Sequence, residues 1–486
     1  MRLWQAPAFR WTVLLVGALA WRLILFVGAQ GSDDLAYSRA AWTVAGGVAP
    51  VDQGIHGNRM GYVGFIGALY ALFGAGSFAL VFLNLAASVA EVALARLVAR
   101  EFLDDDGAWL AAVLVALLPV HVFYATEAHP DLPVAALTTL SALLFLRARK
   151  ADSASLYLAS GLVLGTAHLM KETAFMGLAA LALLGGRPRR PYVHAVAGFA
   201  ILVAFEMLFY WAAAGDPLHR LRGSGAQQAQ IMNSEFYLRT APTFRRLVVD
   251  VPAMFLWPGD GNFTYFALLP LLALGGAVEG WRRRDVSLRG PAGWALGLAA
   301  MLTFWPVSLL PYRPAMVAFP RIFLVAAVPL AILAASFLRR IPFKAALPAF
   351  GAAALLSLGA ALVLHGDGRR ESAGARIAHA ATQDLPVVSD PRTIEFFRLY
   401  DGYRPGRELC AWDKPAPASP HYRVVNGIWL RNMETWNGIL PPPGFEDPGV
   451  APLRIESIPG RLRLRSLLRG RMERVGAEEL RIYKLP

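Results

Sequence analysis

The stretch "WTVLLVGALAWRLILFVGAQ", residues 11–30, decides the class of fold, because Arg22 is its only charged residue. An apolar run of about 20 residues is long enough to cross the hydrocarbon core of a bilayer as an α-helix. The residues that follow, "GSDDLAYSRAAW" at 31–42, are more polar and include two adjacent carboxylates, Asp33 and Asp34. A membrane-spanning helix is thus followed at once by charge at the membrane surface.

The composition extends this interpretation to the whole chain. Of 486 residues, 56% are hydrophobic and 17% are charged, and the mean hydropathy is +0.44, which indicates a polytopic membrane protein. The apolar residues form long blocks instead of alternating with polar ones, so we expect spanning helices and not a β-barrel. A single cysteine, Cys410, excludes an intramolecular disulfide framework.

Apolar runs predict about eleven membrane-spanning helices, near 11–29, 77–97, 108–126, 131–147, 155–170, 173–186, 192–213, 262–280, 291–310, 319–338 and 344–364. Every second connection between them is rich in Lys and Arg, and basic connections face the cytoplasm. We therefore expect a cytoplasmic N-terminus, with the first loop, the loop near 214–261 and the tail from about 366 outside. Much of the net charge of +13 is this bias, so it is no argument for nucleic-acid binding.

The apolar blocks stop after His365, which divides the chain into a transmembrane domain, 1–365, and a soluble domain, 366–486. In the soluble part, "LPVVSD" at 385–390, "HYRVVNGIWL" at 421–430 and "ELRIYKL" at 479–485 are typical of strands, and "PRTIEFFRLYDGY" at 391–403 is typical of a helix. A small extracytoplasmic α/β domain is the expected result. The basic run "RLRLRSLLRGR" at 461–471 is typical of a solvated face, and could also lie on anionic headgroups.

The acid pair has two explanations that the residues leave open. Ser32 can cap a short interfacial helix whose first turn holds Asp33 and Asp34 and which Gly46 and Gly47 end. Alternatively, the carboxylates face a site at the membrane surface.

Further ionisable residues fall at the same predicted face of the membrane. Glu127, His129 and Asp131 lie in "ATEAHPDLP" at 125–133, and Lys171 and Glu172 lie in "LMKETAF" at 169–175. Arg313 and Arg321 flank the connection "LLPYRPAMVAFPRIF" at 309–323. Each of these residues has a structural explanation by itself. Because charged side chains near hydrocarbon are energetically costly, several of them at one depth in the membrane predict a functional cavity.

Three other charged positions are expected to be structural or paired. Arg22 lies inside the first span and needs an anionic partner, and Glu206 in the seventh span needs a cation. The run Asp104 to Asp106 falls in a cytoplasmic loop, where it is expected to cap the helix that begins near Trp109.

The order of these motifs resembles the GT-C membrane glycosyltransferases, in particular bacterial relatives of the protein mannosyltransferases and of the lipid A aminoarabinose transferase. The resemblance rests on Asp33, Asp34 and Tyr37, followed by "HGNRMGYVGFIGALYALFG" at 56–74 with Arg59, "FLNLAASVAEVALARLVARE" at 82–101, "EAHPDLPVAALTTLSALLFL" at 127–146 with Asp131, and "GLVLGTAHLMKETAFMGLAALALL" at 161–184 with Lys171. It covers about the first 220 residues, and more weakly "FPRIFLVAAVPLAILAA" at 319–335. Asp34 stands where the family more often has Glu, and the usual Pro pair beside the basic position is missing.

The resemblance implies an enzyme of a bacterial cytoplasmic membrane. It would transfer a sugar from a polyprenyl phosphate to a hydroxyl of a protein, lipid or glycan at the outer face, with inversion. Asp33 would be the general base, Asp34 and Asp131 would orient the acceptor or the sugar, and Arg59, Lys171 and Arg321 would hold the phosphate. Supporting roles would fall to Tyr37, Arg22, Glu127, His129 and Arg313.

Two alternative functions stay open at this point, a transporter and a scaffold or sensor whose working part is the tail domain. A transporter or flippase for a lipid-linked or small anionic substrate has a similar architecture, although the chain shows no inverted repeat. No spacing indicates a metal site, but Asp33 and Asp34 could together bind a divalent ion.

Overall fold

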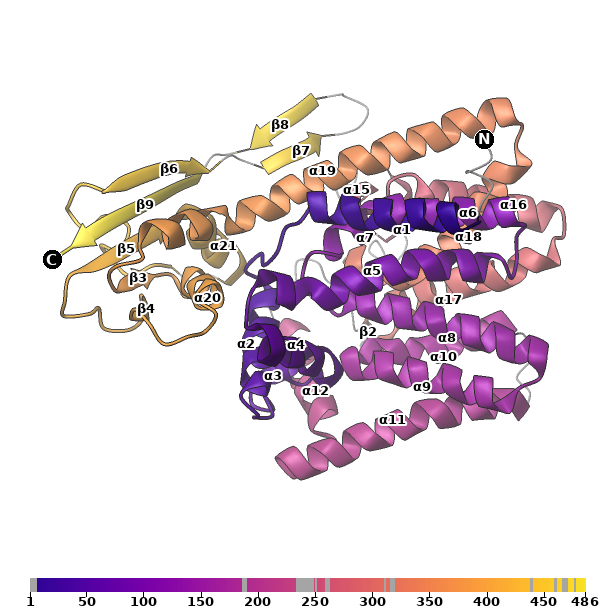
Figure 1. Ribbon diagram of the computed structural model, residues 1–486, viewed down its shortest axis with the longest axis horizontal. Coiled ribbons are helices and arrows are strands. Elements are labelled where there is room, and N and C mark those ends of the chain that lie inside the picture. Colours follow the sequence, from indigo (N-terminus) through magenta and orange to yellow (C-terminus); the bar gives the residue numbers. More distant parts are fainter. Residues whose placement is uncertain are drawn as a thin grey trace.

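The computed structural model describes residues 7–185, 190–232, 249, 251–257, 263–309, 312–314, 320–437, 440–458, 461–465, 471–475 and 478–486. A helical bundle forms the larger part of the structure, and a mixed sheet with helices lies at one end of it (Figure 1). Three of the basic residues in the predicted cytoplasmic segments, Arg2, Arg187 and Arg189, lie outside the described residues.

The first half of the bundle consists of α1 (Pro7–Ile24), α2 (Asp33–Ala45), α3 (Gly54–Gly57), α4 (Met60–Phe73), α5 (Ser77–Ala99), α6 (Asp105–Leu117), α7 (Pro119–Tyr124), α8 (Asp131–Ala151), α9 (Ala154–Met170), η2 (Glu172–Phe175), α10 (Met176–Gly185) and α11 (Arg190–Ala214). The second half consists of α12 (His219–Met232), α14 (Val251–Leu256), α15 (Phe263–Phe266), α16 (Leu269–Arg282), η4 (Val286–Leu288), α17 (Arg289–Phe304), the strands β1 (Pro306–Leu309) and β2 (Tyr312–Pro314), η5 (Pro320–Ala326), α18 (Ala327–Arg340) and α19 (Phe343–Ala381).

The span count of about eleven is not confirmed. Six helical segments among the described residues are long and apolar enough to cross a membrane: Pro7–Ile24, Ser77–Ala99, Asp131–Ala151, Tyr192–Ala214, Pro320–Arg340 and Phe343–Arg370. Shorter apolar helices lie at Met60–Phe73, Ala154–Met170 and Glu172–Leu184. The chain is therefore a multi-pass membrane protein in which long and short apolar helices pack together.

Two expected spans are broken for local reasons. The segment 108–126 divides into α6 and α7 because Pro119 cannot continue the hydrogen-bond ladder, and it forces Leu118 into an extended conformation. The segment 262–280 divides at Ala267, whose φ of +48° belongs to the left-handed region. Neither break can be predicted from the length of an apolar run alone.

The expected cap of α6 is confirmed. Asp104 is its N-cap, and the Asp104 carboxylate accepts a hydrogen bond of 2.8 Å from the backbone N–H of Gly107. Asp105 in the first turn also pairs with Arg96 at 2.6 Å, so this acidic run is structural.

The "GLVLG" motif has a packing role. A Cβ on Gly161 would lie 1.9 Å from the carbonyl oxygen of Ala195, and one on Gly198 would lie 2.3 Å from the carbonyl oxygen of Leu158. Only glycine permits this approach of α9 and α11, as in other membrane helix pairs with small residues at the contact.

α19 continues 39 residues without a break and passes the expected domain boundary at 366 before it ends at Ala381. The C-terminal part comprises β3 (Val387–Ser389), α20 (Pro391–Tyr400), β4 (Leu409–Ala411), β5 (His421–Asn426), α21 (Gly427–Asn437), β6 (Arg454–Ile458), β7 (Arg461–Arg465), β8 (Arg471–Val475) and β9 (Glu478–Leu485). The main sheet has the strand order β4-β3-β5-β9-β6, and β7 pairs with β8. The expected α/β character is confirmed, but "GIWL" opens helix α21 instead of continuing strand β5.

The C-terminal part of the chain, β3 to β9, rests on α2, the helix that carries the acid pair (Figure 1). Trp42 of α2 stacks on Tyr403 with ring centroids 5.5 Å apart, and the Tyr403 hydroxyl donates to Ser38 Oγ at 2.9 Å. Gly31, just before α2, has a φ of +94° and lies against the rings of Trp429 and Phe396. The C-terminal domain therefore fixes the start of α2 from the side opposite to the bundle.

Replacement of Gly31 should test this docking. A Cβ at Gly31 would lie 2.2 Å from Trp429 Cζ2, whereas a Cβ at Gly47, with φ +79°, would meet nothing within 4 Å. Both Gly→Ala changes carry the left-handed penalty of about 1–2 kcal/mol, and Gly31→Ala should lose a further ~1–3 kcal/mol through overpacking. Denaturant unfolding of both variants in detergent measures the difference, and equal losses would show that Trp429 does not press on this loop.

Candidate active site

Asp33 occupies the first position of α2, as expected, and α2 ends before Gly46. Ser32 makes no side-chain cap, so the helix start is held in another way. One carboxylate oxygen of Asp33 accepts from Arg321 Nη2 at 2.9 Å, and the other lies 3.3 Å from His56 Nε2. The Asp33 side chain keeps 33% of its surface exposed. It is a charged group held at the open side of a cluster.

Asp33 is strongly biased toward its ionised form. Burial disfavours the charge, but the hydrogen bond with His56 and the positive charge of Arg321 outweigh it, so the pKa of Asp33 lies well below its usual value. Asp33 is thus a carboxylate at neutral pH and a weak base in this arrangement.

Asp34 points away from Asp33 into the connection between α1 and α2. The fully buried carboxylate accepts backbone N–H groups of Gln30, of Gly31 at 3.3 Å and of Ser32 at 2.7 Å. Burial and the charge of Glu127 raise its pKa. These contacts make Asp34 the residue that shapes the loop before α2, in place of a side-chain cap by Ser32.

Asp131, Lys171 and Arg321 join three separate elements. Asp131 begins α8, Lys171 lies between α9 and η2, and Arg321 lies in η5. The Lys171 ammonium is 2.5 Å from Asp131 Oδ1, and Arg321 Nε is 4.0 Å from Asp131 Oδ2. Since Arg321 also binds Asp33, it bridges the two acids that the sequence motifs singled out.

Glu127 and His129 complete this arrangement, which we call the acid–base cluster: Asp33, His56, Glu127, His129, Asp131, Lys171 and Arg321. His129 Nδ1 lies 3.0 Å from Arg321 Nη1, and Nε2 lies 2.9 Å from Glu127 Oε1. Arg321 Nη1 also lies 3.1 Å from Nε2, so the guanidinium lies beside both ring nitrogens of His129. Asn84 of α5 holds the backbone here, since its amide donates to the carbonyls of Glu127 at 2.8 Å and His129 at 2.6 Å.

Arg59 belongs to a neighbouring group of charges. It donates to the Tyr37 hydroxyl and pairs with Glu172 at 3.0 Å. Burial opposes the ionisation of Glu172, but the charges of Arg59 and Arg220 prevail and hold its pKa below the usual range. The edge of the Tyr37 ring packs on His56, with centroids 4.9 Å apart. Arg59 therefore supports the wall of the cluster, and its guanidinium already has partners.

Glu206 of α11 and Arg220 of α12 are paired as well. Arg220 of α12 forms a salt bridge with Glu206 of α11 and lies 3.3 Å from Glu172. The structural pairing expected for Glu206 is confirmed, and it ties α12 to the Arg59 group.

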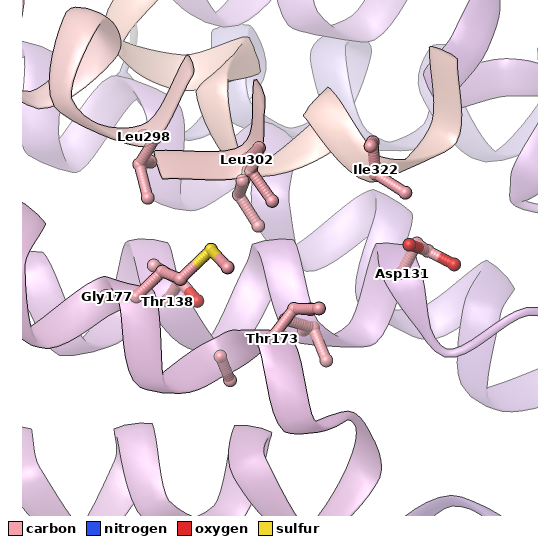
Figure 2. Close-up of a pocket in the computed structure, with 11 residues that line it drawn as sticks. Asp131, Thr138, Thr173, Gly177, Leu298, Leu302 and Ile322 are labelled. Carbon is pink, nitrogen blue, oxygen red and sulfur yellow. The ribbon is translucent and has the colours of Figure 1, made fainter. Parts of the chain in front are cut away.

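A narrow crevice begins at Asp131 and continues between helices. Its cavity volume is about 10 Å³, and beyond Asp131 it is lined mostly by apolar side chains of α8, α10, α17 and η5. Figure 2 shows Leu298, Leu302 and Ile322 on one side and Thr138, Thr173 and Gly177 on the other, with the Asp131 carboxyl group at one end. The acid–base cluster thus borders an apolar path into the bundle.

Arg22 lies outside the cluster, in a separate buried network. Its Nε donates to Ser88 Oγ at 2.5 Å, and its Nη2 lies 3.3 Å from His121 Nδ1. His121 Nε2 is 2.8 Å from Glu91, which also accepts from Thr139 at 3.1 Å. The expected anionic partner is therefore Glu91, reached through His121.

Glu91→Gln should destabilise the bundle because it leaves Arg22 buried without an anion nearby. Loss of one partner of a buried pair typically costs about 3–5 kcal/mol. Glu101→Gln is a suitable control, since its partner Lys150 is an exposed side chain and surface pairs contribute ~0–1 kcal/mol. Denaturant unfolding compares the two, and a Glu91 effect as small as that of Glu101 would mean that the Arg22 network is unimportant for stability.

The described residues contain no group of three or more His, Cys, Asp or Glu side chains that could hold a metal ion. Asp33 and Asp34 in particular point to different partners. Arg313 lies in β2, and its side chain is outside what the structure describes.

Of the remaining expected site residues, the structure brings together Asp33, Glu127, His129, Asp131, Lys171 and Arg321, with Tyr37 and Arg59 beside them. Sequence reasoning missed His56, Asn84 and Arg220. His56 stands in the quoted stretch that contains Arg59, and Asn84 is a lone amide in an apolar span, which are the signals that could have found them.

A family model described as dolichyl-phosphate-mannose-protein mannosyltransferase matches residues 62–211, a range that includes Asp131 and Lys171. The chain is similar to ArnT from Cupriavidus metallidurans in the apo state, with 12% identity, a TM-score of 0.58, and 99% of this chain and 98% of that chain covered. For the same protein bound to undecaprenyl phosphate, the values are 13%, 0.53, 98% and 98%.

A third similar structure is the oligosaccharyltransferase of Archaeoglobus fulgidus in complex with Zn and sulfate, with 15% identity and a TM-score of 0.53. The match covers 88% of this chain and 70% of that one. The search of curated proteins gave no match.

Proposed function

We propose that this chain, a glycosyltransferase of the GT-C superfamily that includes the protein mannosyltransferases and ArnT, transfers a sugar from a polyprenyl phosphate to an acceptor hydroxyl at the outer face of a bacterial cytoplasmic membrane. The observation that carries the proposal is the bridge made by Arg321. It brings a carboxylate, Asp33, within reach of a second acid and its lysine, Asp131 and Lys171. These are the groups that the reaction needs.

The chemistry assigns a role to each end of the cluster. The acceptor oxygen attacks the anomeric carbon, the bond from that carbon to the phosphate oxygen breaks, and the acceptor proton passes to the Asp33 carboxylate. The polyprenyl phosphate leaves with an additional negative charge, which Arg321 and Lys171 stabilise. Attack from the side opposite to the phosphate inverts the anomeric configuration.

The contact between Asp33 and Arg321 has to open for this reaction, because a sugar cannot fit between groups 2.9 Å apart. A donor phosphate would replace Asp33 as the partner of Arg321. The cation that depresses the pKa of Asp33 would then be neutralised by the phosphate, so the pKa would rise and Asp33 would become a stronger base. Donor binding would thereby prepare the base for the next step.

A weak base is tolerable in this reaction class. If the sugar carries oxocarbenium character before the acceptor loses its proton, proton transfer is late, as in glycoside hydrolysis. His56, at 3.3 Å from Asp33 Oδ1, keeps the carboxylate in place after Arg321 has turned to the phosphate.

The crevice beside Asp131 supports a lipid-linked donor. Its apolar walls run from the charged cluster into the bundle, and with a volume of about 10 Å³ it would have to widen for the first part of a prenyl chain to enter while the phosphate meets Lys171 and Arg321. The similar ArnT structure contains undecaprenyl phosphate, a ligand of this chemical class. We assign Asp34 to shaping the loop before α2 and Arg59 to supporting Tyr37 and the site wall.

Reconstituted protein tests the proposal against the transporter alternative. Proteoliposomes would receive a polyprenyl phosphate carrying a radiolabelled sugar together with a membrane extract as the source of acceptor. A glycosyltransferase moves the label to an acceptor and releases polyprenyl phosphate, whereas a flippase moves the intact donor between leaflets. Donor translocation without any cleavage of the sugar–phosphate bond would refute the proposal.

A further inference from the structure

A second hollow lies where α16 and α17 are joined. This connection is at the end of the bundle remote from α2 (Figure 1). It has a volume of about 800 Å³. The connection between the helices turns sharply, with Arg284 at φ +53° and the backbone N–H of Asp285 bonded to the Gly280 carbonyl at 2.8 Å. The proposed transfer reaction makes no use of this region.

The lining of this hollow is divided into an apolar and a basic part. The apolar part lies between the two helices and consists of Ala277, Gly280, Leu288 and Ala292. The rim carries Trp281, Arg282, Arg284, Asp285 and Arg289. Such a combination fits an amphiphile whose charged end is an anion.

Ion pairing within the described part of the chain leaves two of these arginines for a ligand. Glu279 pairs with Arg283 at 2.5 Å and with Arg282 at 3.8 Å, and Asp285 pairs with Arg340. No described side chain forms a hydrogen bond or an ion pair with Arg284 or Arg289. Both are exposed, so a surplus of positive charge faces the hollow.

The position in the membrane points to a lipid. The apolar segment Pro320–Arg340 ends at Arg340, which contacts Asp285, so the rim lies where a spanning helix leaves the hydrocarbon. Trp281 is 82% exposed there, as is common for tryptophan at the headgroup level of a bilayer. The hollow is therefore next to lipid headgroups rather than deep in water.

We propose that this hollow binds an anionic phospholipid, with its phosphate on Arg284 and Arg289 and the start of an acyl chain on the apolar lining. Basic pockets between membrane helices are suited to such headgroups. The apolar lining favours a lipid over a free phosphate ester, and the site is independent of the transferase reaction.

Native mass spectrometry of the purified full chain would test this proposal by titration with phosphatidylglycerol. The double variant Arg284→Gln/Arg289→Gln should bind about thirtyfold more weakly, since each arginine near the surface contributes about fivefold. Arg147→Gln/Arg149→Gln is the matched control, because it removes the same charge from exposed positions at the end of α8. Phosphatidylcholine and glycerol 3-phosphate serve as further ligands.

The expected result is strong retention of phosphatidylglycerol by the parent and the control, with loss only in the Arg284/Arg289 variant. Equal binding by all three proteins, or an equal loss in the control, would overturn the proposal. So would glycerol 3-phosphate or phosphatidylcholine bound as tightly as phosphatidylglycerol, since either result would remove the need for an anionic lipid. Unfolding curves of the variants establish that a loss of binding does not reflect a loss of fold.

Discussion

Asp33→Asn is expected to lower the rate of sugar transfer by about 10²–10⁴-fold, the contribution that a positioned general base typically makes. The amide keeps the size of the side chain but cannot accept the acceptor proton. Donor binding should persist, because Arg321 and Lys171 are retained and Arg321 loses its competing carboxylate. Initial rates and donor dissociation constants, measured with a radiolabelled polyprenyl phosphate sugar, separate the two effects.

Asp52→Asn is the control for this variant. Asp52 lies in the loop between α2 and α3, just before the helix that carries His56, and is exposed. Its replacement removes the same charge without touching the acid–base cluster, so transfer should stay near the parent rate. Full activity of Asp33→Asn would exclude Asp33 as the base, even if the chain proved to be a transferase.

Arg321→Gln should lower transfer by about 10²–10³-fold, similar to the loss of one donor that stabilises a developing negative charge. Unlike Asp33→Asn, it should also weaken donor binding, because the phosphate loses a cation in the ground state as well. The two variants therefore differ in how they divide the effect between the donor dissociation constant and the rate of the chemical step.

The same variant predicts a change in pH dependence with a defined sign. Arg321 favours the charged form of Asp33 and so contributes to its low pKa. Removal of Arg321 should raise that pKa, so that the residual kcat/KM falls off at a higher pH on acidification than in the parent. A pH profile that does not move would show that Arg321 acts on the phosphate alone and not on the base.

Arg339→Gln is a matched control for Arg321→Gln. Arg339 pairs with Asp104 at 2.7 Å on the surface, at the cap of α6, so its loss removes an arginine–carboxylate pair of similar length. Transfer should remain close to the parent rate.

Much of the site could be predicted because its residues are charges that interrupt apolar sequence. Asp33, Asp131, Lys171 and Arg321 each lie at a helix end or a connection, and positive-inside reasoning assigned them to one face. The structure brings these four together. The rule that charge near hydrocarbon needs a partner also identified Arg22 and Glu206 as paired residues.

Pairing between distant segments could not be predicted. Asp33 and Asp34 are adjacent in the chain, but the helical rotation between them turns one toward Arg321 and the other toward backbone N–H groups. Arg59 was predicted to bind phosphate, but its guanidinium pairs with Glu172 and donates to the Tyr37 hydroxyl. These contacts depend on how α9 packs beside α4. The predicted span 108–126 was wrong because hydropathy alone indicated one helix, whereas Pro119 divides the segment into α6 and α7.

An experimental structure of the protein with a bound polyprenyl phosphate tests the central claim most directly. The account predicts phosphate oxygens within hydrogen-bond distance of Arg321 and Lys171, Asp33 released from Arg321 and directed to the acceptor side, and the prenyl chain entering the crevice next to Asp131. A phosphate bound away from these two cations, with the Asp33–Arg321 pair intact, would contradict it.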